Sequence, residues 1–183
     1  ALLLVAPALK DGLVLRMQGD IISRPYIDLT LCTMREFGAK AEWTSHDTIT
    51  VWPEPYLDIP YYIENDWSAA SYWYEMMALC DDDQAEVRLE GLKDGSRQGD
   101  SQLRYIFSLL GIKTTFEVDA KDKTRSTVVL RRKPCPLHRL DYDFSGCPDL
   151  AQTFVVTCCM LGLPFRFEGL STLKIKETDR IEA

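Results

Sequence analysis

Several features that would assign this 183-residue chain to a particular class are missing from it. No apolar run approaches the roughly 18 residues of a membrane-spanning helix, and the apolar segment 1–9 lacks the basic region and cleavage site of a signal peptide. The formal net charge is −7, whereas a nucleic-acid-binding surface normally carries an excess of basic residues. These absences argue against a membrane protein and against RNA or DNA as a partner.

Cysteine pairs with the spacing of a metal site are also missing. None of the six cysteines forms a Cys-X-X-Cys motif, and Cys135 with His138 and Cys147 has poor zinc spacing and no second pair of ligands. We therefore expect buried or free thiols and no metal, in a protein of a reducing, cytoplasmic compartment. The cysteines are Cys32, Cys80, Cys135, Cys147, Cys158 and Cys159.

The composition that remains is ordinary for a globular protein, with 46% hydrophobic and 27% charged residues. Its positive charge is local, in the segments 131–133 and 174–180, and five of the seven residues in the second segment are ionisable. Local positive charge in an acidic chain suits a small anionic substrate better than a charged polymer.

A layout of strand, polar loop and helix occurs three times. Each strand alternates apolar and polar residues and ends at a glycine, and a loop of about eight residues leads into a helix with apolar i, i+3, i+4 spacing. In the first two copies the helix ends at Gly38 or Gly111, as a left-handed cap requires. The expected strands are 12–19, 85–91 and 165–169, and the expected helices are 26–38, 100–111 and the first turn at 178–181.

Each repeated strand also follows an apolar helix, expected at 1–9, 68–79 and 148–161. In the two complete copies, two further strands joined by a polar turn follow the second helix. The unit therefore reads β-α-β-α-β-β, which places the chain in the α/β (α+β) class. The further strands are 39–43 with 48–52 and 114–118 with 126–131, the turns are 45–47 and 119–123, and short first strands are expected at 61–64 and 141–144.

The three loops after the repeated strands carry the candidate chemistry. In such units these loops lie at the carboxyl ends of strands, beside helix N-termini, where ligands often bind. All three contain cations, in the segments 20–25, 92–99 and 170–177. One such loop alone is explained by a solvated turn, whereas three aligned cationic loops favour an anion-binding site.

Lys176, Glu177 and Arg180 offer the most specific chemistry. Lys176 and Arg180 lie four residues apart and would share a helical face, with Glu177 within reach of Arg180. Arginine suits a bidentate contact with a carboxylate or phosphate, and a carboxylate beside cations stays ionised until a proton is needed. The alternative interpretation is a salt-bridged turn on the surface.

Residues at three helix starts have two interpretations each. Tyr26 follows Pro25 and either packs on a ring-shaped ligand or anchors the loop. Asp149 follows Pro148 and either stabilises the first helical turn or accepts a substrate hydroxyl. Asp66 precedes the helix at 68–79, where we expect it to act as a cap.

Five short motifs, in this order and spacing, closely resemble the 5-enolpyruvylshikimate-3-phosphate synthase family, and the resemblance covers essentially the whole chain. The string Lys-Glu-Thr-Asp-Arg separates this family from the related transferase that acts on UDP-N-acetylglucosamine. The motifs are Ser-Arg-Pro-Tyr-Ile-Asp at 23–28, Glu-Asn-Asp-Trp-Ser-Ala-Ala-Ser-Tyr at 64–72, Gln-Gly-Asp at 98–100, Pro-Asp at 148–149 and Lys-Glu-Thr-Asp-Arg at 176–180.

The resemblance implies a monomeric enzyme of two lobes, each made of three β-α-β-α-β-β units with pseudo-threefold symmetry. It also implies transfer of the enolpyruvyl group of phosphoenolpyruvate to the 5-hydroxyl of shikimate 3-phosphate, with release of phosphate, in aromatic amino-acid biosynthesis. The reaction passes through a tetrahedral intermediate by addition and elimination. No metal or organic cofactor takes part in this chemistry.

The matched positions imply two catalytic residues. Asp149 would hold the reacting hydroxyl and is a candidate base, and Glu177 would shuttle protons. Thr172 stands where the family often has Asn, and its hydroxyl could replace part of the contact that the amide makes with substrate.

The other matched positions would bind substrate. Ser23 and Tyr26 would contact shikimate 3-phosphate, with Arg24 a neighbouring candidate. Lys176 would lie against substrate, and Arg180 would hold phosphoenolpyruvate.

The segment 52–60 contains three prolines and predicts an extended connector between two parts of the chain. By the resemblance, 1–60 is the last unit of one lobe without its first strand, and 61–183 is the first unit of the other lobe with the start of the next. The chain has no initiating Met and opens inside a helical pattern, so we interpret it as an internal fragment and expect it to be inactive alone. The alternative is a non-catalytic α/β module that binds small anions and shares the fold.

Overall fold

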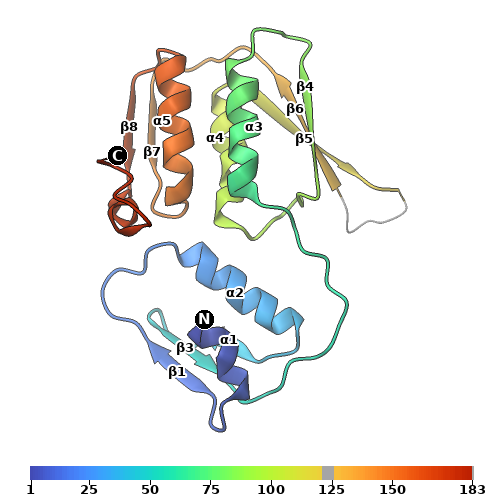
Figure 1. The fold of residues 1–183 in the computed structure, drawn as a ribbon, viewed down its shortest axis with the longest axis vertical. Coiled ribbons are helices and arrows are strands. Elements are labelled where there is room, and N and C mark those ends of the chain that lie inside the picture. The colour runs from blue at the N-terminus through green and yellow to red at the C-terminus, as the bar shows by residue number, and fades with distance from the viewer. Residues whose placement is uncertain (121–125, 183) are drawn as a thin grey trace. The chain divides into compact units, whose positions relative to one another are not determined.

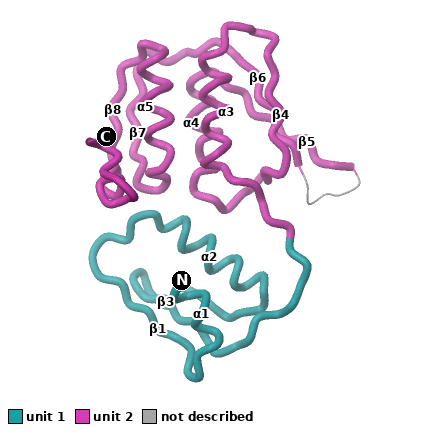
Figure 2. The backbone as a smooth tube through the Cα atoms, viewed as in Figure 1, with its two compact units in different colours: residues 1–61 teal, residues 62–183 magenta. Residues whose placement is uncertain are grey.

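A computed structural model of the chain describes residues 1–120 and 126–182. The chain forms two compact units, Ala1–Tyr61 and Tyr62–Ala183, which are coloured separately in Figure 2. Both units combine helices with sheets, which confirms the predicted α/β class. Part of the expected turn at 119–123 lies outside the described residues. No helix in the described part of the chain is both long and apolar enough to cross a bilayer.

The first unit is a three-stranded antiparallel sheet covered by one long helix (Figure 1). The strand order is β1-β3-β2, and Leu31 and Met34 of the helix are buried with Ile49 and Val51 of the central strand. The expected helix at 1–9 divides after Val5 into an α-helix and a 3-10 turn, and Pro7 in the turn cannot donate the backbone hydrogen bond that would continue the α-helix. The elements are α1 Leu2–Val5, the 3-10 turn η1 Ala6–Ala8, β1 Leu13–Arg16, α2 Arg24–Glu36, β2 Ala41–Trp43 and β3 Thr48–Val51.

The second unit contains two sheets. One is antiparallel with the order β4-β6-β5, and the other is the parallel pair β7-β8, whose crossover is α5. This β-α-β crossover is the one expected for the start of the third repeat. The elements are α3 Trp67–Leu79, β4 Glu86–Glu90, η2 Gly99–Gln102, α4 Leu103–Leu109, β5 Ile112–Val118, β6 Ser126–Arg132, β7 Leu140–Asp143, η3 Pro148–Leu150, α5 Ala151–Met160, β8 Phe165–Glu168 and η4 Ser171–Ile175.

The core of the second unit joins both sheets through the helices α3, α4 and α5. Helices α3 and α5 pack against each other, as Figure 1 shows. Phe154 of α5 contacts Phe107 of α4 and Phe144, which follows β7, with ring centroids 4.4 and 5.5 Å apart. All three rings are fully buried, so their packing joins the start of the third repeat to the second repeat in one core.

The expected short strand at 61–64 is wrong. The ring of Tyr61 packs on Phe37 and its hydroxyl donates to Glu36, so this residue is held in the first unit. Beyond it, the Glu64 carboxylate is occupied by side-chain and loop contacts, and one backbone bond, from Asn65 N–H to Gly91 O, reaches the end of β4. Parallel pairing is weak per residue, and Pro60 just before the segment offers no N–H. The segment therefore forms no strand.

Gly169 ends β8 and is required there for two reasons, its φ of +75° and its close packing. An added Cβ would lie 2.3 Å from the backbone nitrogen of Ser145 and 2.4 Å from Oδ1 of Asp143. Gly95 has almost the same φ, +74°, with open space around the Cβ position.

We expect Gly169→Ala to lower the free energy of unfolding by about 2–4 kcal/mol, because backbone strain and overpacking add. Gly95→Ala is the matched control and should cost about 1 kcal/mol, because it suffers the strain alone. Urea denaturation of both variants measures the difference. Equal losses would show that the contact with the 143–145 turn relaxes without cost.

All six cysteines are free, as the sequence predicts. Cys147 and Cys158 are buried in the second unit, and Cys135 and Cys159 are exposed. Burial raises the pKa of the Cys147 thiol from 9.0 to about 12, and nearby Asp100 and Asp143 add to the effect. Burial also raises the pKa of the Tyr74 hydroxyl to about 12.

Raising the pH from about 9 to about 12 is therefore expected to destabilise the second unit. The unfolded state releases these protons at lower pH than the folded state, so stability present below the unfolded pKa is lost as the pH approaches the folded pKa. Urea midpoints measured across this range should fall, and the fall should be smaller in Cys147→Ala. Cys159→Ala is the control, and a slope changed equally by both substitutions would contradict the assignment.

Candidate active-site loop

Asp149 is the centre of a charged cluster in the second unit. It lies in η3, the turn that leads into α5, and its carboxylate is about a quarter exposed. Lys176 Nζ lies 3.2 Å from this carboxylate, and Nη1 of Arg180 donates to it at 3.1 Å. Asp149 therefore lies in the first turn and faces the loop 171–180. Its role as an acceptor for a substrate hydroxyl stays a prediction.

Lys176 and Arg180 do not share a helical face, so that expectation is wrong. The turn η4 ends at Ile175, Lys176 is extended, and the expected helix at 178–181 is a hydrogen-bonded turn capped by Asp179. The loop folds back because Arg180 N–H donates to Leu173 O at 3.0 Å, and Leu173 is buried. Loop closure over a buried leucine, rather than helical periodicity, brings both cations to Asp149.

Glu177 is held at the solvent side of the cluster. Nη2 of Arg180 donates to its carboxylate at 2.6 Å, while 79% of the glutamate side chain is exposed. Its own backbone N–H and the Arg180 guanidinium lower the pKa of Glu177, and the hydrogen bond to Glu177 raises the pKa of Arg180. Both groups are therefore ionised near neutral pH.

The four charges of the cluster balance. Lys176 and Arg180 face Asp149 and Glu177, so an anionic ligand must displace or share one of these carboxylates. Thr172 belongs to the same loop, and its hydroxyl is buried without a hydrogen-bond partner in the part of the chain that the structure describes. A buried hydroxyl without a partner costs free energy, so Thr172 is one position of the loop where a rearrangement could add a hydrogen bond.

Comparison with known proteins identifies the family of the chain. The family model described as EPSP synthase (3-phosphoshikimate 1-carboxyvinyltransferase) matches residues 1–183. The chain belongs to the EPSP synthase family. It is 52% identical to the 3-phosphoshikimate 1-carboxyvinyltransferase of Bacteroides fragilis over all 183 residues, which are 42% of that protein. It is 32% identical to the enzyme of the same name from Methanospirillum hungatei, again over the whole chain and 41% of the relative. The chain thus spans about two fifths of the relatives' length.

The family-matched residues of the first unit lie at the start of α2. Ser23 precedes the helix in the left-handed conformation, with φ of +56°, and its carbonyl accepts the N–H of Tyr26. Arg24 stacks over the Trp43 ring at 3.9 Å and donates to His46 O at 3.3 Å. Arg24, but neither Ser23 nor Tyr26, lines an open pocket of about 660 Å³ beside the end of β1. Arg24 is therefore fixed in its own unit by aromatic stacking and one hydrogen bond.

Two further residues position elements of the second unit, and the residue patterns assigned no role to either. Tyr72 of α3 accepts a hydrogen bond from Gln152 of α5 at 3.4 Å, which links the two helices. Glu64 accepts from Trp67 Nε1, from Lys93 N–H and from Ser96 Oγ at 2.8–2.9 Å, which fixes the loop 92–98. Both lie inside the matched motif at 64–72, which was the available signal.

Asp66 caps α3, as predicted, and accepts the N–H of Ser68 at 2.8 Å. Over residues 1–120 and 126–182, no three His, Cys, Asp or Glu side chains are grouped to hold a metal ion.

Proposed function

We propose that this chain supplies part of the active site of an enzyme that transfers the enolpyruvyl group of phosphoenolpyruvate to the 5-hydroxyl of shikimate 3-phosphate. The observation that carries the proposal is the Asp149 carboxylate held between Lys176 and Arg180, with Glu177 on the same guanidinium. The cluster combines a base, a second proton-transfer group and cations for phosphate or carboxylate. The relatives' names supply the substrate class.

In the addition step, the oxygen of the 5-hydroxyl bonds to C2 of phosphoenolpyruvate, and Asp149 accepts the proton that this hydroxyl loses. The methylene carbon takes up a proton and becomes a methyl group, which gives a tetrahedral intermediate. Glu177 is the proposed carrier of this proton. It is ionised while it contacts Arg180, so it must first take a proton from solvent, to which its side chain is 79% exposed, when Arg180 turns to the substrate. Arg180 balances the charge of phosphoenolpyruvate.

In the elimination step, the C2–O bond to phosphate breaks and a proton leaves the methyl carbon for Glu177, which restores the enol ether. Ser23, Arg24 and Tyr26 are proposed contacts of shikimate 3-phosphate. Thr172, with its unpartnered hydroxyl, and Lys176 are proposed contacts from the loop. No step calls for a metal or an organic cofactor.

We also propose that 1–60 completes one lobe of this enzyme and that 61–183 begins the other. The balanced charges around Asp149 support the view that further cations must come from the rest of the protein before anionic substrates bind tightly. The 183-residue chain should therefore release phosphate from the two substrates at close to background rate.

Phosphate release by a full-length enzyme that contains this chain tests the proposal. Arg180→Ala should raise KM for phosphoenolpyruvate and lower kcat, whereas Arg166→Ala, which removes an exposed arginine paired with Glu168 on β8, should change neither. Robust turnover by the 183-residue chain alone would contradict the division of the site. An inactive full-length protein that binds inorganic phosphate as well as shikimate 3-phosphate would favour the non-catalytic anion-binding module instead.

A further inference from the structure

The second unit contains a pocket between α4 and β5, which none of the residues proposed for catalysis lines. Its volume is about 450 Å³, within the usual range of small-molecule sites. Its lining comes from the loop before α4, from α4 itself, from β5 and from the residue that follows β6. None of the residues proposed above to bind or convert substrate lines it.

Arg104 on α4 gives this pocket a largely desolvated positive charge. Its side chain is 13% exposed, Nη1 donates to Asp94 at 2.7 Å, and Nη2 donates to the Tyr105 hydroxyl at 2.8 Å. The buried Nε has no hydrogen-bond partner among the described residues. Asp94 is 66% exposed, so water weakens its compensation of the guanidinium. A buried and incompletely paired cation favours additional negative charge close by.

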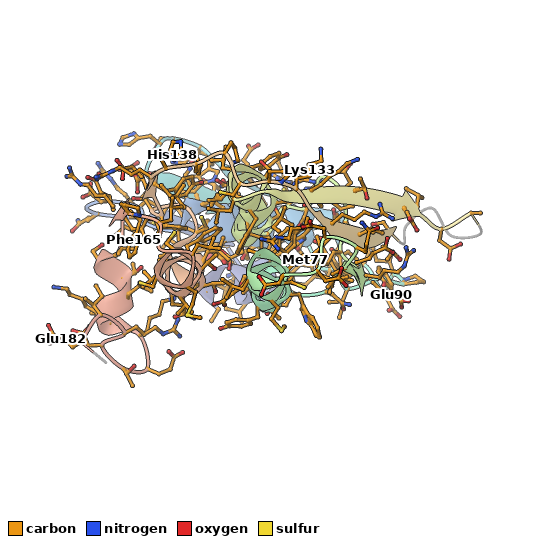
Figure 3. All side chains as sticks on the ribbon, turned by 90° about the horizontal axis from the view of Figure 1, so that it is seen from above. Met77, Glu90, Lys133, His138, Phe165 and Glu182 are labelled. Atoms are coloured by element: carbon orange, nitrogen blue, oxygen red, sulfur yellow. The ribbon has the colours of Figure 1, made fainter. Side chains whose placement is uncertain are left out.

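Two lysines add to this charge at the edge of the sheet. Lys113 and Lys133 both line the pocket. The backbone N–H of Lys133 donates to Gly111 O at 2.7 Å, which holds Lys133 beside the start of β5, where Lys113 lies. Both side chains are exposed, and neither forms an ion pair within the described ranges; Lys133 is labelled in Figure 3. Asp94 is the carboxylate in the lining, so an excess of positive charge remains from Arg104, Lys113 and Lys133.

Aromatic rings form the other part of the lining. The Arg104 guanidinium carbon lies 4.7 Å from the ring centroid of Tyr105 and 5.3 Å from that of Phe116. Both rings line the pocket, and the Tyr105 side chain is largely exposed. A planar apolar body can pack against such rings while an anionic end reaches the lysines.

We propose that this pocket binds small aromatic carboxylates, with the ring against Tyr105 and Phe116 and the carboxylate drawn to the positive charge of Arg104, Lys113 and Lys133. Inorganic phosphate would satisfy the charge and leave the aromatic wall exposed. A purely apolar ligand would leave Arg104 and the two lysines uncompensated. The combination of rings and cations selects a ligand that has both features.

Titration of the 183-residue chain with benzoate, followed by amide chemical shifts, tests the proposal. The shifts should concentrate at residues 104–116 and around Lys133. Lys113→Gln combined with Lys133→Gln should weaken binding about fivefold, the effect expected from losing two exposed ion pairs. Lys10→Gln, an exposed lysine of the first unit, is the matched control and should leave affinity unchanged.

Comparing benzoate with acetate and inorganic phosphate distinguishes the contribution of the ligand's charge from that of its aromatic ring. Both should bind at least about fivefold more weakly than benzoate, because they lack a ring to pack on Tyr105 and Phe116. Tyr105→Ala should bring benzoate down to the level of acetate, with the fold checked by circular dichroism. Equal affinities for benzoate and acetate, unchanged affinity in the lysine variant, or shifts centred on Asp149 would each overturn the proposal.

Discussion

Asp149→Asn is expected to lower kcat by about 10²- to 10⁴-fold in a full-length enzyme that contains this chain, the usual range for loss of a general base. Asparagine keeps the size of the side chain but cannot accept the proton of the 5-hydroxyl. It also leaves Lys176 and Arg180 without the charge that lies 3.2 and 3.1 Å from them. Steady-state rates of phosphate release, measured at saturating concentrations of both substrates, check the prediction.

Asp141→Asn is the control for this experiment. Asp141 lies on β7, is paired with Arg139 and is exposed, so its loss should leave kcat and KM unchanged. An unchanged kcat with a raised KM in Asp149→Asn would contradict the role proposed for Asp149, because it would mean that the residue only holds substrate. A similar fall in both variants would point to damage of the β7–α5 region rather than to lost chemistry.

Phe154→Ala should cost about 3–5 kcal/mol in the free energy of unfolding of the second unit, the range for removing a fully buried phenylalanine. The Phe154 ring joins Phe107 of the second repeat to Phe144 of the third, and a cavity there removes contacts on both sides. Native-state amide exchange of α5 and β6 measures the loss within the second unit.

Val156→Ala provides the comparison on the same helix. Val156 is 49% exposed, so its truncation should cost less than about 0.5 kcal/mol. If Phe154→Ala destabilises α5 but leaves β6 unchanged, the two sheets unfold independently, and the shared aromatic core does not couple them.

Most elements could be predicted because they depend on local patterns. Alternation predicted β1, β4 and β8, and helical periodicity predicted α2, α3 and α5, in each case to within a few residues. Gly38 and Gly111 end their helices with φ of +86° and +87°, as a left-handed cap requires. Two expectations failed where local pattern was not decisive. The segment 61–64 has strand-like residues without a strand partner, and 176–180 has helical spacing without a helix.

The candidate site was predictable in part. Lys176, Glu177, Arg180 and Asp149 were selected from the sequence, and the structure brings these four together. Their roles, like those of Ser23, Arg24, Tyr26 and Thr172, stay predictions, as do the lobe assignment, the monomeric state and a cytoplasmic location.

The sequence by itself determined the repeat, the glycine-ended strands, the free cysteines and the family, because each is written in local residue types and spacing. Only the tertiary structure decided how Asp149 meets Lys176 and Arg180 across 27 and 31 residues of sequence. That meeting depends on the parallel β7-β8 pair, on buried Leu173 and on the backbone bond from Arg180 to Leu173. The pocket beside Arg104 has the same origin, since its cations come from α4, from β5 and from the residue after β6, which become neighbours only when the core packs.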